Sequence, residues 1–361
     1  MTGVRPVITH IPVAAPGVPP WGCATALPVG EPPKKCDVLI VGAGITGLTA
    51  AMSIAQGGRD VTVIERAFGS GATSRSGGIV LGDTLVGPAP GFGDCHEALR
   101  TWVHDSGADC DLVWGGCVEL ARDASLPSRP IDWQAEGTVR LAGPISGGVL
   151  DPMKFQHALV DTARLAGVAL VNRVTVVGMA LRGSRPAVLT DRGQITAQHV
   201  VMAVDATAQT DRFDPWRERV ITLALQTTPL SEAVLAAVGL TAHQAFYTRD
   251  LPLLWGRVMP DRSMLIGRET LAFPGSHTKV LPDDFATASA RLTARVHRLH
   301  PALTHIEVRR TWGGPIARSP GGVPAIVVDP NHPRVIWVGG YGGHGMAQAF
   351  KLGRLTAERL R

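Results

Sequence analysis

The chain has 361 residues, with 35 lysine and arginine residues against 30 acidic ones, and so a formal net charge of +5. Hydrophobic residues make up 45% of the sequence, which is enough to build a large core and excludes intrinsic disorder for most of it. The length indicates two domains, or one large domain with an insertion. Because the basic residues are scattered and aromatic residues are few, no nucleic-acid partner is expected.

The cysteines and the N-terminal residues bear on location. Five cysteines are an odd number without a Cys-x-x-Cys pair, so we expect reduced thiols, no metal site and a cytoplasmic protein. Residues 1–23 contain His10 and several prolines, which interrupt the apolar run that a secretory signal requires. The stretch 38–58 is uncharged and long enough to cross a bilayer. Its glycines and polar residues indicate a strand, a turn and a buried helix instead, so no membrane span is expected.

A dinucleotide-binding fingerprint occupies this stretch. An apolar strand, Cys36 to Val41, leads into a GxGxxG motif, then a helix, then a second apolar strand that ends at Glu65. The motif consists of Gly42, Ala43, Gly44, Ile45, Thr46 and Gly47. Its glycines allow, in order, a tight turn, the approach of a pyrophosphate to the backbone, and close packing of helix on strand. The pyrophosphate is expected at the helix N-terminus, and Glu65 is placed to accept hydrogen bonds from a ribose.

The fingerprint by itself does not distinguish NAD from FAD. After Glu65 and Arg66 comes a small, polar, glycine-rich segment, 69–80, which can lie along an extended cofactor and leave room for a tricyclic ring. An ordinary flexible loop is the other interpretation of that composition. Near the C-terminus, the apolar strand 335–340 ends in a second glycine-rich turn that opens an amphipathic helix. The N-terminus of that helix carries free N–H groups and a partial charge of about +0.5.

These segments resemble the D-amino-acid-oxidase-like flavoproteins, a family that includes glycine oxidase and sarcosine oxidase. The resemblance is carried by the GxGxxG turn, Glu65-Arg66, GATSRSGG at 71–78, the stretch 310–329, and the turn GYGGHGM before the last helix. It covers most of the chain from Cys36 to Leu360. Within the family, WGGPIARS at 312–319 and the proline-rich leader with Trp21 are most similar to the gamma-glutamylputrescine oxidase branch.

The resemblance implies an α/β fold, α+β overall, with a Rossmann-like FAD-binding domain and an antiparallel-sheet substrate domain. The expected ranges are an N-terminal extension, 1–35, a discontinuous FAD-binding domain, 36–90, 147–212 and 306–361, and a substrate domain, 91–146 and 213–305. Between the motifs, the sequence predicts a helix that begins at Pro152, one strand over 169–181 and a hairpin around Asp191-Arg192-Gly193. A second hairpin, 251–269, is expected over the flavin.

The family also implies which residues hold FAD, with Val176 at the adenine and the last helix at the pyrimidine edge of the flavin, where negative charge collects on reduction. The residues assigned to FAD are Gly42, Ala43, Gly44, Ile45, Thr46, Gly47, Glu65, Arg66, Ala72, Thr73, Ser74, Arg75, Gly77, Gly78, Val176, Gly342, Gly343, His344, Gly345 and Met346. His344 is interpreted as a flavin contact rather than a general base. The positions of covalent attachment in relatives hold Ser74-Arg75 and Trp312 here, so non-covalent FAD is predicted.

The family's reaction is hydride removal from the carbon next to an amine nitrogen, which predicts a FAD-dependent amine oxidoreductase acting on CH–NH or CH–NH2 groups. The flavin supplies this chemistry, which agrees with a sequence that shows no convincing triad, carboxylate pair or metal cluster. Relatives that oxidise α-amino acids carry an Arg where this chain has Pro315-Ile316. A small-molecule amine without an α-carboxylate is therefore favoured. Arg268 is the cation nearest the place of an oxygen-activating Lys, so O2 and an electron-transfer partner both stay open as acceptors.

A separate set of residues comprises the candidates for the substrate pocket and for catalysis. Pocket candidates are Tyr247, Trp255, Arg257, Trp312 and Tyr341; of these, Tyr247, Arg257 and Trp312, together with His344, are the catalytic candidates. A buried aromatic side chain commonly serves packing alone, and Arg257 could bind a substrate acid group or form a surface ion pair. Two other classes stay open: a non-catalytic FAD-binding subunit of a larger oxidoreductase complex, and an NAD(P)-linked dehydrogenase, against which GATSRSGG and YGGHGM argue.

Overall fold

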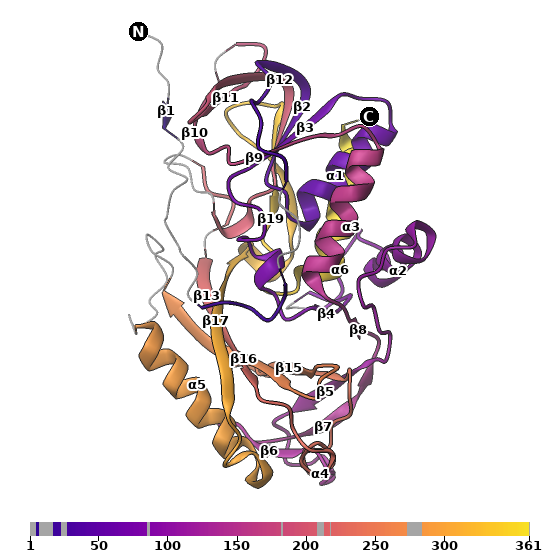
Figure 1. The fold of residues 1–361 in the computed structure, drawn as a ribbon, viewed down its shortest axis with the longest axis vertical. Coiled ribbons are helices and arrows are strands. Elements are labelled where there is room, and N and C mark those ends of the chain that lie inside the picture. The colour runs from indigo at the N-terminus through magenta and orange to yellow at the C-terminus, as the bar shows by residue number, and fades with distance from the viewer. Residues whose placement is uncertain are drawn as a thin grey trace.

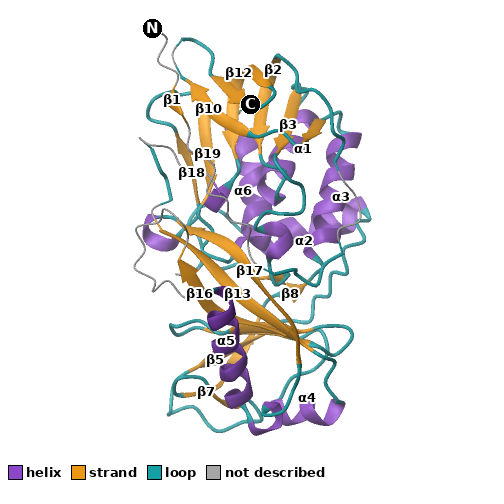
Figure 2. Cartoon of the chain, turned by 60° about the vertical axis from the view of Figure 1, so that its left-hand side comes forward, coloured by secondary structure: helices purple, strands orange, loops and turns teal. Residues whose placement is uncertain are grey.

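The computed structural model describes residues 5–6, 17–22, 27–84, 87–181, 183–207, 213–216, 218–272 and 284–360. Two large sheets follow one another along the long axis of the molecule (Figure 1). One half carries a mainly parallel sheet with helices against it, and the other half carries a mainly antiparallel sheet with a long helix on its outer face (Figure 2). In the described part of the chain, no helix is long and apolar enough to cross a membrane.

The first sheet has nine strands among the described residues, and its centre is parallel. The strand β2 (Lys35–Val41) lies between β3 (Val61–Glu65) and β12 (Gly193–Met202), and β9 (Ala169–Asn172) and β19 (Val335–Gly339) continue the parallel pairing on either side. The antiparallel strands are β1 (Arg5–Pro6), β10 (Val176–Ala180), β11 (Ala187–Thr190) and β18 (Ala325–Val328). The apolar run of β2 is buried on both faces, which is typical of a covered parallel sheet.

Four helices belong to this half: α1 (Ile45–Gln56), α2 (Cys95–Ser106), α3 (Pro152–Leu165) and α6 (Gly345–Arg359). The helices α1 and α6 lie side by side, and a glycine permits their close contact. A Cβ atom at Gly353 would come within 2.8 Å of the carbonyl oxygen of Thr46. The first turns of α1 are thereby held against the third turn of α6.

The second sheet has eight strands in the part of the chain that is described. In sheet order they are β17 (Val308–Arg318), β13 (Glu218–Thr227), β16 (Met264–Ala272), β15 (Trp255–Val258), β14 (Ala245–Thr248), β5 (Cys117–Ala121), β7 (Thr138–Ile145) and β6 (Asp132–Gln134). All neighbours are antiparallel except β14 and β5, which are parallel. A short ribbon of β4 (Ile79–Val80) and β8 (Gly148–Val149) lies between the two halves (Figure 1).

The two faces of the second sheet have different neighbours. The helix α5 (Phe285–Leu299) covers one face of the sheet. Its buried residues form one core cluster with Ile221, Leu223 and Leu225 of β13. The alternate residues of β13 point to the opposite face, toward the first half. The remaining short elements are α4 (Glu232–Val238), η1 (Thr73–Arg75), η2 (Asp205–Thr207), η3 (Pro301–Leu303) and η4 (Pro320–Gly322).

The predicted fold class is confirmed, and several details of the chain differ from the sequence prediction. The single strand predicted over 169–181 is wrong, because the structure has two strands there. Among the described strands, β9 lies at one end of the sheet, and β10 lies near the other end, next to β1. Arg173 between them has φ 59°, which breaks the extended backbone. The last predicted range, 306–361, is divided, because β17 belongs to the second sheet. Conversely, α2 lies in a range assigned to the substrate domain but packs against α6. We therefore propose that β17 belongs to the substrate domain and that α2 belongs to the FAD-binding domain.

Candidate cofactor and substrate site

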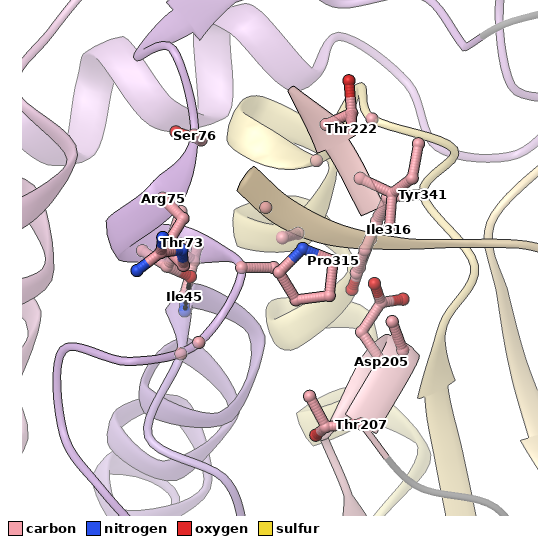
Figure 3. A pocket seen from close by; sticks show the side chains of 18 of the residues that line it. Ile45, Thr73, Arg75, Ser76, Asp205, Thr207, Thr222, Pro315, Ile316 and Tyr341 are labelled. Atoms are coloured by element: carbon pink, nitrogen blue, oxygen red, sulfur yellow. Dashed lines mark hydrogen bonds between the residues drawn. The ribbon is translucent and has the colours of Figure 1, made fainter. Parts of the chain in front are cut away.

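A cavity of about 520 Å³ lies between the two sheets. The parallel strands β2, β3, β12 and β19 all end at its edge, which is where ligands bind in open α/β sheets. Figure 3 shows the segment with Thr73, Arg75 and Ser76 on one side, and Asp205, Ile316 and Tyr341 on the other. All residues predicted to bind the cofactor line this cavity except Ala43, Gly47 and Ser74.

The three glycines of the fingerprint have different steric environments. Gly42 has φ 106°, and a Cβ there would lie 2.5 Å from the carbonyl oxygen of Ala203. A Cβ at Gly47 would lie 1.9 Å from the carbonyl oxygen of Gly42, so this glycine allows helix packing and does not line the cavity. At Gly44 the nearest atom to an added Cβ would be Oγ1 of Thr73, at 3.2 Å. The absence of a side chain at Gly44 therefore leaves its backbone accessible to a ligand in the cavity.

Glu65 fixes two backbone segments at the cavity edge. Its Oε2 accepts a hydrogen bond from the N–H of Ala43 at 2.8 Å, and its Oε1 accepts one from the N–H of Ala67 at 2.9 Å. A carboxylate has about four lone-pair sites, so each oxygen can accept a further hydrogen bond from a hydroxyl group. The position suits the ribose contact predicted from the sequence.

The helices that begin at the cavity lack the N-terminal side-chain caps that the other helices have. The helices α2, α3, α4 and α5 are capped by the side chains of Asp94, Asp151, Ser231 and Asp284. The helices α1 and α6 have no side-chain cap and no acidic residue in the first turn. Both of these uncapped N-termini line the cavity. Their N–H groups and the positive ends of their dipoles favour an anionic group there, which fits a dinucleotide with a reducible flavin.

Tyr341 and His344 precede α6. The hydroxyl of Tyr341 lies 2.6 Å from Oγ1 of Thr46, and burial raises the pKa of this tyrosine. Burial lowers the pKa of His344, which favours the neutral imidazole. Its Nδ1 is shielded from solvent and has no hydrogen-bond partner in the described part of the chain. A bound cofactor can supply that partner, which supports the interpretation of His344 as a cofactor contact.

Asp205 is a cavity residue that sequence reasoning missed. It follows β12 with φ 40°, and its Oδ1 accepts a hydrogen bond from the N–H of Gly340 at 2.8 Å. Burial raises the pKa of Asp205 to about 6, while backbone hydrogen bonds and the charge of Arg219 act in the opposite direction. The only signal in the sequence is a carboxylate directly after a buried strand, at the edge where ligands bind.

Aromatic side chains form much of the wall on the side of the second sheet. The ring of Trp255 fits between two glycines, since a Cβ at Gly77 or at Gly267 would come within 2.5 Å or 2.0 Å of it. Tyr247 donates its O–H to Oε1 of Glu119 at 3.2 Å, and burial raises the pKa of Tyr247. Together with Trp312 and Tyr341, both of these candidates line the cavity.

Arg257 is the pocket candidate that the structure places elsewhere. Its side chain is buried and lies behind the cavity wall, where Nη1 donates to the carbonyl oxygens of Gly78 at 3.1 Å and Leu150 at 2.8 Å. Burial lowers its pKa to about 10. Of the two alternatives left open for Arg257, a surface ion pair does not fit this buried position, and neither does a substrate ligand.

The charged residues on the second-sheet wall are paired. Arg318 donates to Oε1 of Glu218 at 2.7 Å, across the β13–β17 pair. Arg268 forms an ion pair with Glu136 and donates to the carbonyl oxygen of Pro252 at 3.1 Å. Pro315 and Ile316 line the cavity, and none of its described lining residues is a lysine. The wall thus offers apolar and aromatic surface rather than an isolated charge.

The fold and the site define a flavoprotein oxidoreductase built on a Rossmann-like domain. Residues 37–359 match the DAO family, described as FAD dependent oxidoreductase, and the chain belongs to this family. FAD is therefore its cofactor, as predicted, and the NAD(P)-linked alternative is wrong. The uncapped N-termini and the orphaned Nδ1 of His344 fit that cofactor.

Several known proteins similar to this chain are oxidoreductases. The gamma-glutamylputrescine oxidoreductase of Escherichia coli K12 is 25% identical over 376 residues, covering 90% of this chain and 84% of that protein. Two solved structures share the fold. The L-proline dehydrogenase from P. horikoshii has a TM-score of 0.72 at 21% identity, covering 91% of this chain and 94% of its own. The glycine oxidase from Geobacillus kaustophilus has a TM-score of 0.69 at 18% identity, with the same coverage of 91% and 94%.

Proposed function

We propose that this protein oxidises a small-molecule amine by removing a hydride from the carbon next to the nitrogen. The nitrogen loses a proton, the product is an imine, and water then hydrolyses the imine. FAD, when bound, supplies the hydride acceptor. The observation that carries the proposal is a single cavity with the uncapped N-termini of α1 and α6 on one side and an aromatic wall on the other. Similarity to the gamma-glutamylputrescine oxidoreductase supports an amine as the substrate class.

The cofactor residues have separable tasks in this proposal. The N–H groups at the start of α1 bind the pyrophosphate, and Glu65 binds the ribose hydroxyls. Val176 contacts the adenine. The turn 342–346 contacts the flavin, where the positive end of the α6 dipole favours the charge that reduction brings. No cysteine is among the described lining residues, and Ser74 donates its hydroxyl to backbone carbonyls, which supports non-covalent FAD.

The substrate side positions the amine and excludes water. Trp255, Trp312 and Tyr247 provide apolar surface, so a neutral amine is oriented by shape and by contact with the aromatic rings. Pro315 and Ile316 offer no cation to an α-carboxylate, and the nearby Arg318 already pairs with Glu218. The substrate is therefore an amine without an α-carboxylate. The free thiols of Cys36, Cys95, Cys110 and Cys117 support a cytoplasmic location.

An anaerobic absorbance titration tests this function. The purified flavoprotein is mixed with γ-glutamylputrescine, primary amines, N-methyl amino acids and glycine, and bleaching of the flavin band is recorded. Cadaverine and lysine form a matched pair that differs only in the α-carboxylate, and we expect cadaverine to react faster. A faster reaction with lysine would contradict the proposed substrate class.

The same titration separates the remaining alternatives. A protein that holds FAD but is bleached by no amine would support the non-catalytic FAD-binding subunit instead. Once bleaching is seen, admission of air distinguishes the two acceptors. Rapid recovery of the oxidised spectrum identifies O2 as the acceptor, and slow recovery identifies an electron-transfer partner.

A further inference from the structure

Four successive backbone carbonyls of the cofactor segment accept hydrogen bonds from side chains. The indole N–H of Trp312 donates to the carbonyl oxygen of Arg75 at 3.1 Å, and the indole N–H of Trp21 donates to that of Ser76 at 2.9 Å. Nη1 of Arg257 donates to the carbonyl oxygens of the next two residues, at 3.4 Å and 3.1 Å. All four residues, 75–78, line the cavity. Their peptide planes are fixed by Trp312, which is part of the cavity wall, and by Trp21 and Arg257, which lie behind it.

Trp21 comes from a segment that precedes the Rossmann-like domain. Its side chain is buried and packs with Met153, Ala224, Leu265 and Trp312. The segment that carries Trp21 contacts both the cofactor segment and β17. Arg75 donates to the carbonyl oxygen of Gly17 at 2.7 Å, and a Cβ at Gly17 would lie only 2.0 Å from the carbonyl oxygen of Thr311. The segment 17–22 therefore lies directly against the outer side of the cavity wall.

Trp21 also covers a buried cation. The guanidinium carbon of Arg257 lies 5.5 Å from the centre of the Trp21 ring. Arg257 forms no ion pair in the described part of the chain, so its charge is stabilised by carbonyl oxygens and by the face of the indole. Loss of the ring would admit water to this guanidinium and weaken its hold on Gly77 and Gly78.

We propose that Trp21 is a positioning residue of the cofactor site. It fixes the segment 75–78 in the conformation that accepts FAD, through its hydrogen bond to Ser76 and through its cover of Arg257. Trp21 lies outside residues 37–359, which match the family model. The inference concerns cofactor affinity and goes beyond the proposed reaction, since it does not depend on which amine is oxidised.

Titration of FAD into the full-length apoprotein tests the proposal, with flavin fluorescence as the signal. The variant W21F keeps a smaller aromatic ring in the same space and removes the N–H donor. We expect it to raise the Kd for FAD about fivefold, the effect of one lost hydrogen bond. W21A removes the ring as well and should raise the Kd further. Both variants should alter the visible spectrum of the bound flavin, because the segment beside it has moved.

The matched control is W102F. Trp102 packs against Phe155 and Phe350, in the helical layer away from segment 75–78. We expect W102F to keep the wild-type Kd and spectrum, even if its melting temperature falls. An unchanged Kd in W21F and W21A would overturn the proposal, and so would an equal rise in W102F. If W21A does not fold, W21F decides. Failure of every amine to bleach the flavin would count against the proposed function and leave this result intact.

Discussion

The hydroxyl of Tyr341 lies 2.6 Å from Oγ1 of Thr46, and this buried hydrogen bond joins the first turn of α1 to the loop before α6. The two helices thereby present their uncapped N-termini to one cavity in a fixed relative position. Since helix dipoles act only over the first turn, the distance between the two ends determines whether both can act on the same ligand. The Thr46–Tyr341 pair is therefore a structural link within the cofactor site.

Removal of this link should cost stability. We expect Y341F to lower the free energy of unfolding by about 1 kcal/mol, because it leaves the hydroxyl of Thr46 without its partner. T46V should cost a similar amount. The double variant should cost less than the sum, with a coupling energy of about 1 kcal/mol measured by urea unfolding. Strictly additive losses would show that the hydrogen bond contributes nothing.

The glycines of the fingerprint should separate folding from cofactor binding. In G47A the new Cβ meets the backbone oxygen of Gly42 at 1.9 Å, so α1 must move, at a cost of about 1–3 kcal/mol or more in stability. In G44A the new Cβ meets only the side chain of Thr73, at 3.2 Å, so the fold should persist while the approach of the pyrophosphate is blocked. Thermal unfolding and FAD titration of both variants check this difference. A G44A variant with wild-type FAD affinity would contradict it.

Glu65 should contribute to FAD binding through its charge. The variant E65Q keeps one acceptor oxygen but replaces the other with an amide NH2, which faces the N–H of Ala43 or Ala67. We expect the Kd for FAD to rise about 10- to 100-fold, the range for loss of a hydrogen bond to a charged group. Isothermal titration measures the change. The control E97Q alters an acidic residue in the first turn of α2, away from the cavity, and should leave the Kd unchanged.

Asp205 should make stability depend on pH in a predictable direction. Burial raises its pKa from 3.8 to about 6, so between these values the folded protein holds a proton that the unfolded chain has released. Stability therefore falls as the pH rises through this window, and the loss is complete above about pH 6. The variant D205N keeps an oxygen for the N–H of Gly340 and has no such loss.

Urea unfolding at pH 4 and pH 7 measures this effect. The advantage of D205N over the wild type should grow by up to about 3 kcal/mol between the two pH values. The other titrating groups cancel in this difference because both proteins share them. A difference that is the same at both pH values would show that Asp205 titrates as an exposed aspartate does.

The parts of the site that can be predicted from the sequence are those determined by residues close together in the chain. Gly42, Gly44 and Gly47 are required by one turn, and Glu65 follows a strand of recognisable pattern, so their places in the cavity wall or behind it follow from short-range geometry. The mainly parallel and antiparallel sheets likewise follow from local patterns of apolar residues.

The parts that sequence did not predict depend on packing between distant segments. Strand alternation places Arg257 and Trp255 on one face of β15, but it cannot show that Trp255 reaches the cavity while Arg257 turns to carbonyls behind it. The sheet that β17 joins is decided by its long-range pairing with β13. The contact of Trp21 with Ser76 joins residues 55 apart, and no periodicity in the sequence indicates it.

The link between α1 and α6 joins two parts of the chain that are synthesised at different times. Thr46 and Tyr341 are 295 residues apart, so the fingerprint turn emerges from the ribosome long before the second helix end that completes the cavity. A nascent chain that stops before α6 would carry the motif and lack the wall that holds the flavin. The cavity is therefore complete only once residues 341–346 have been synthesised. FAD that binds the completed cavity stabilises the folded chain by mass action.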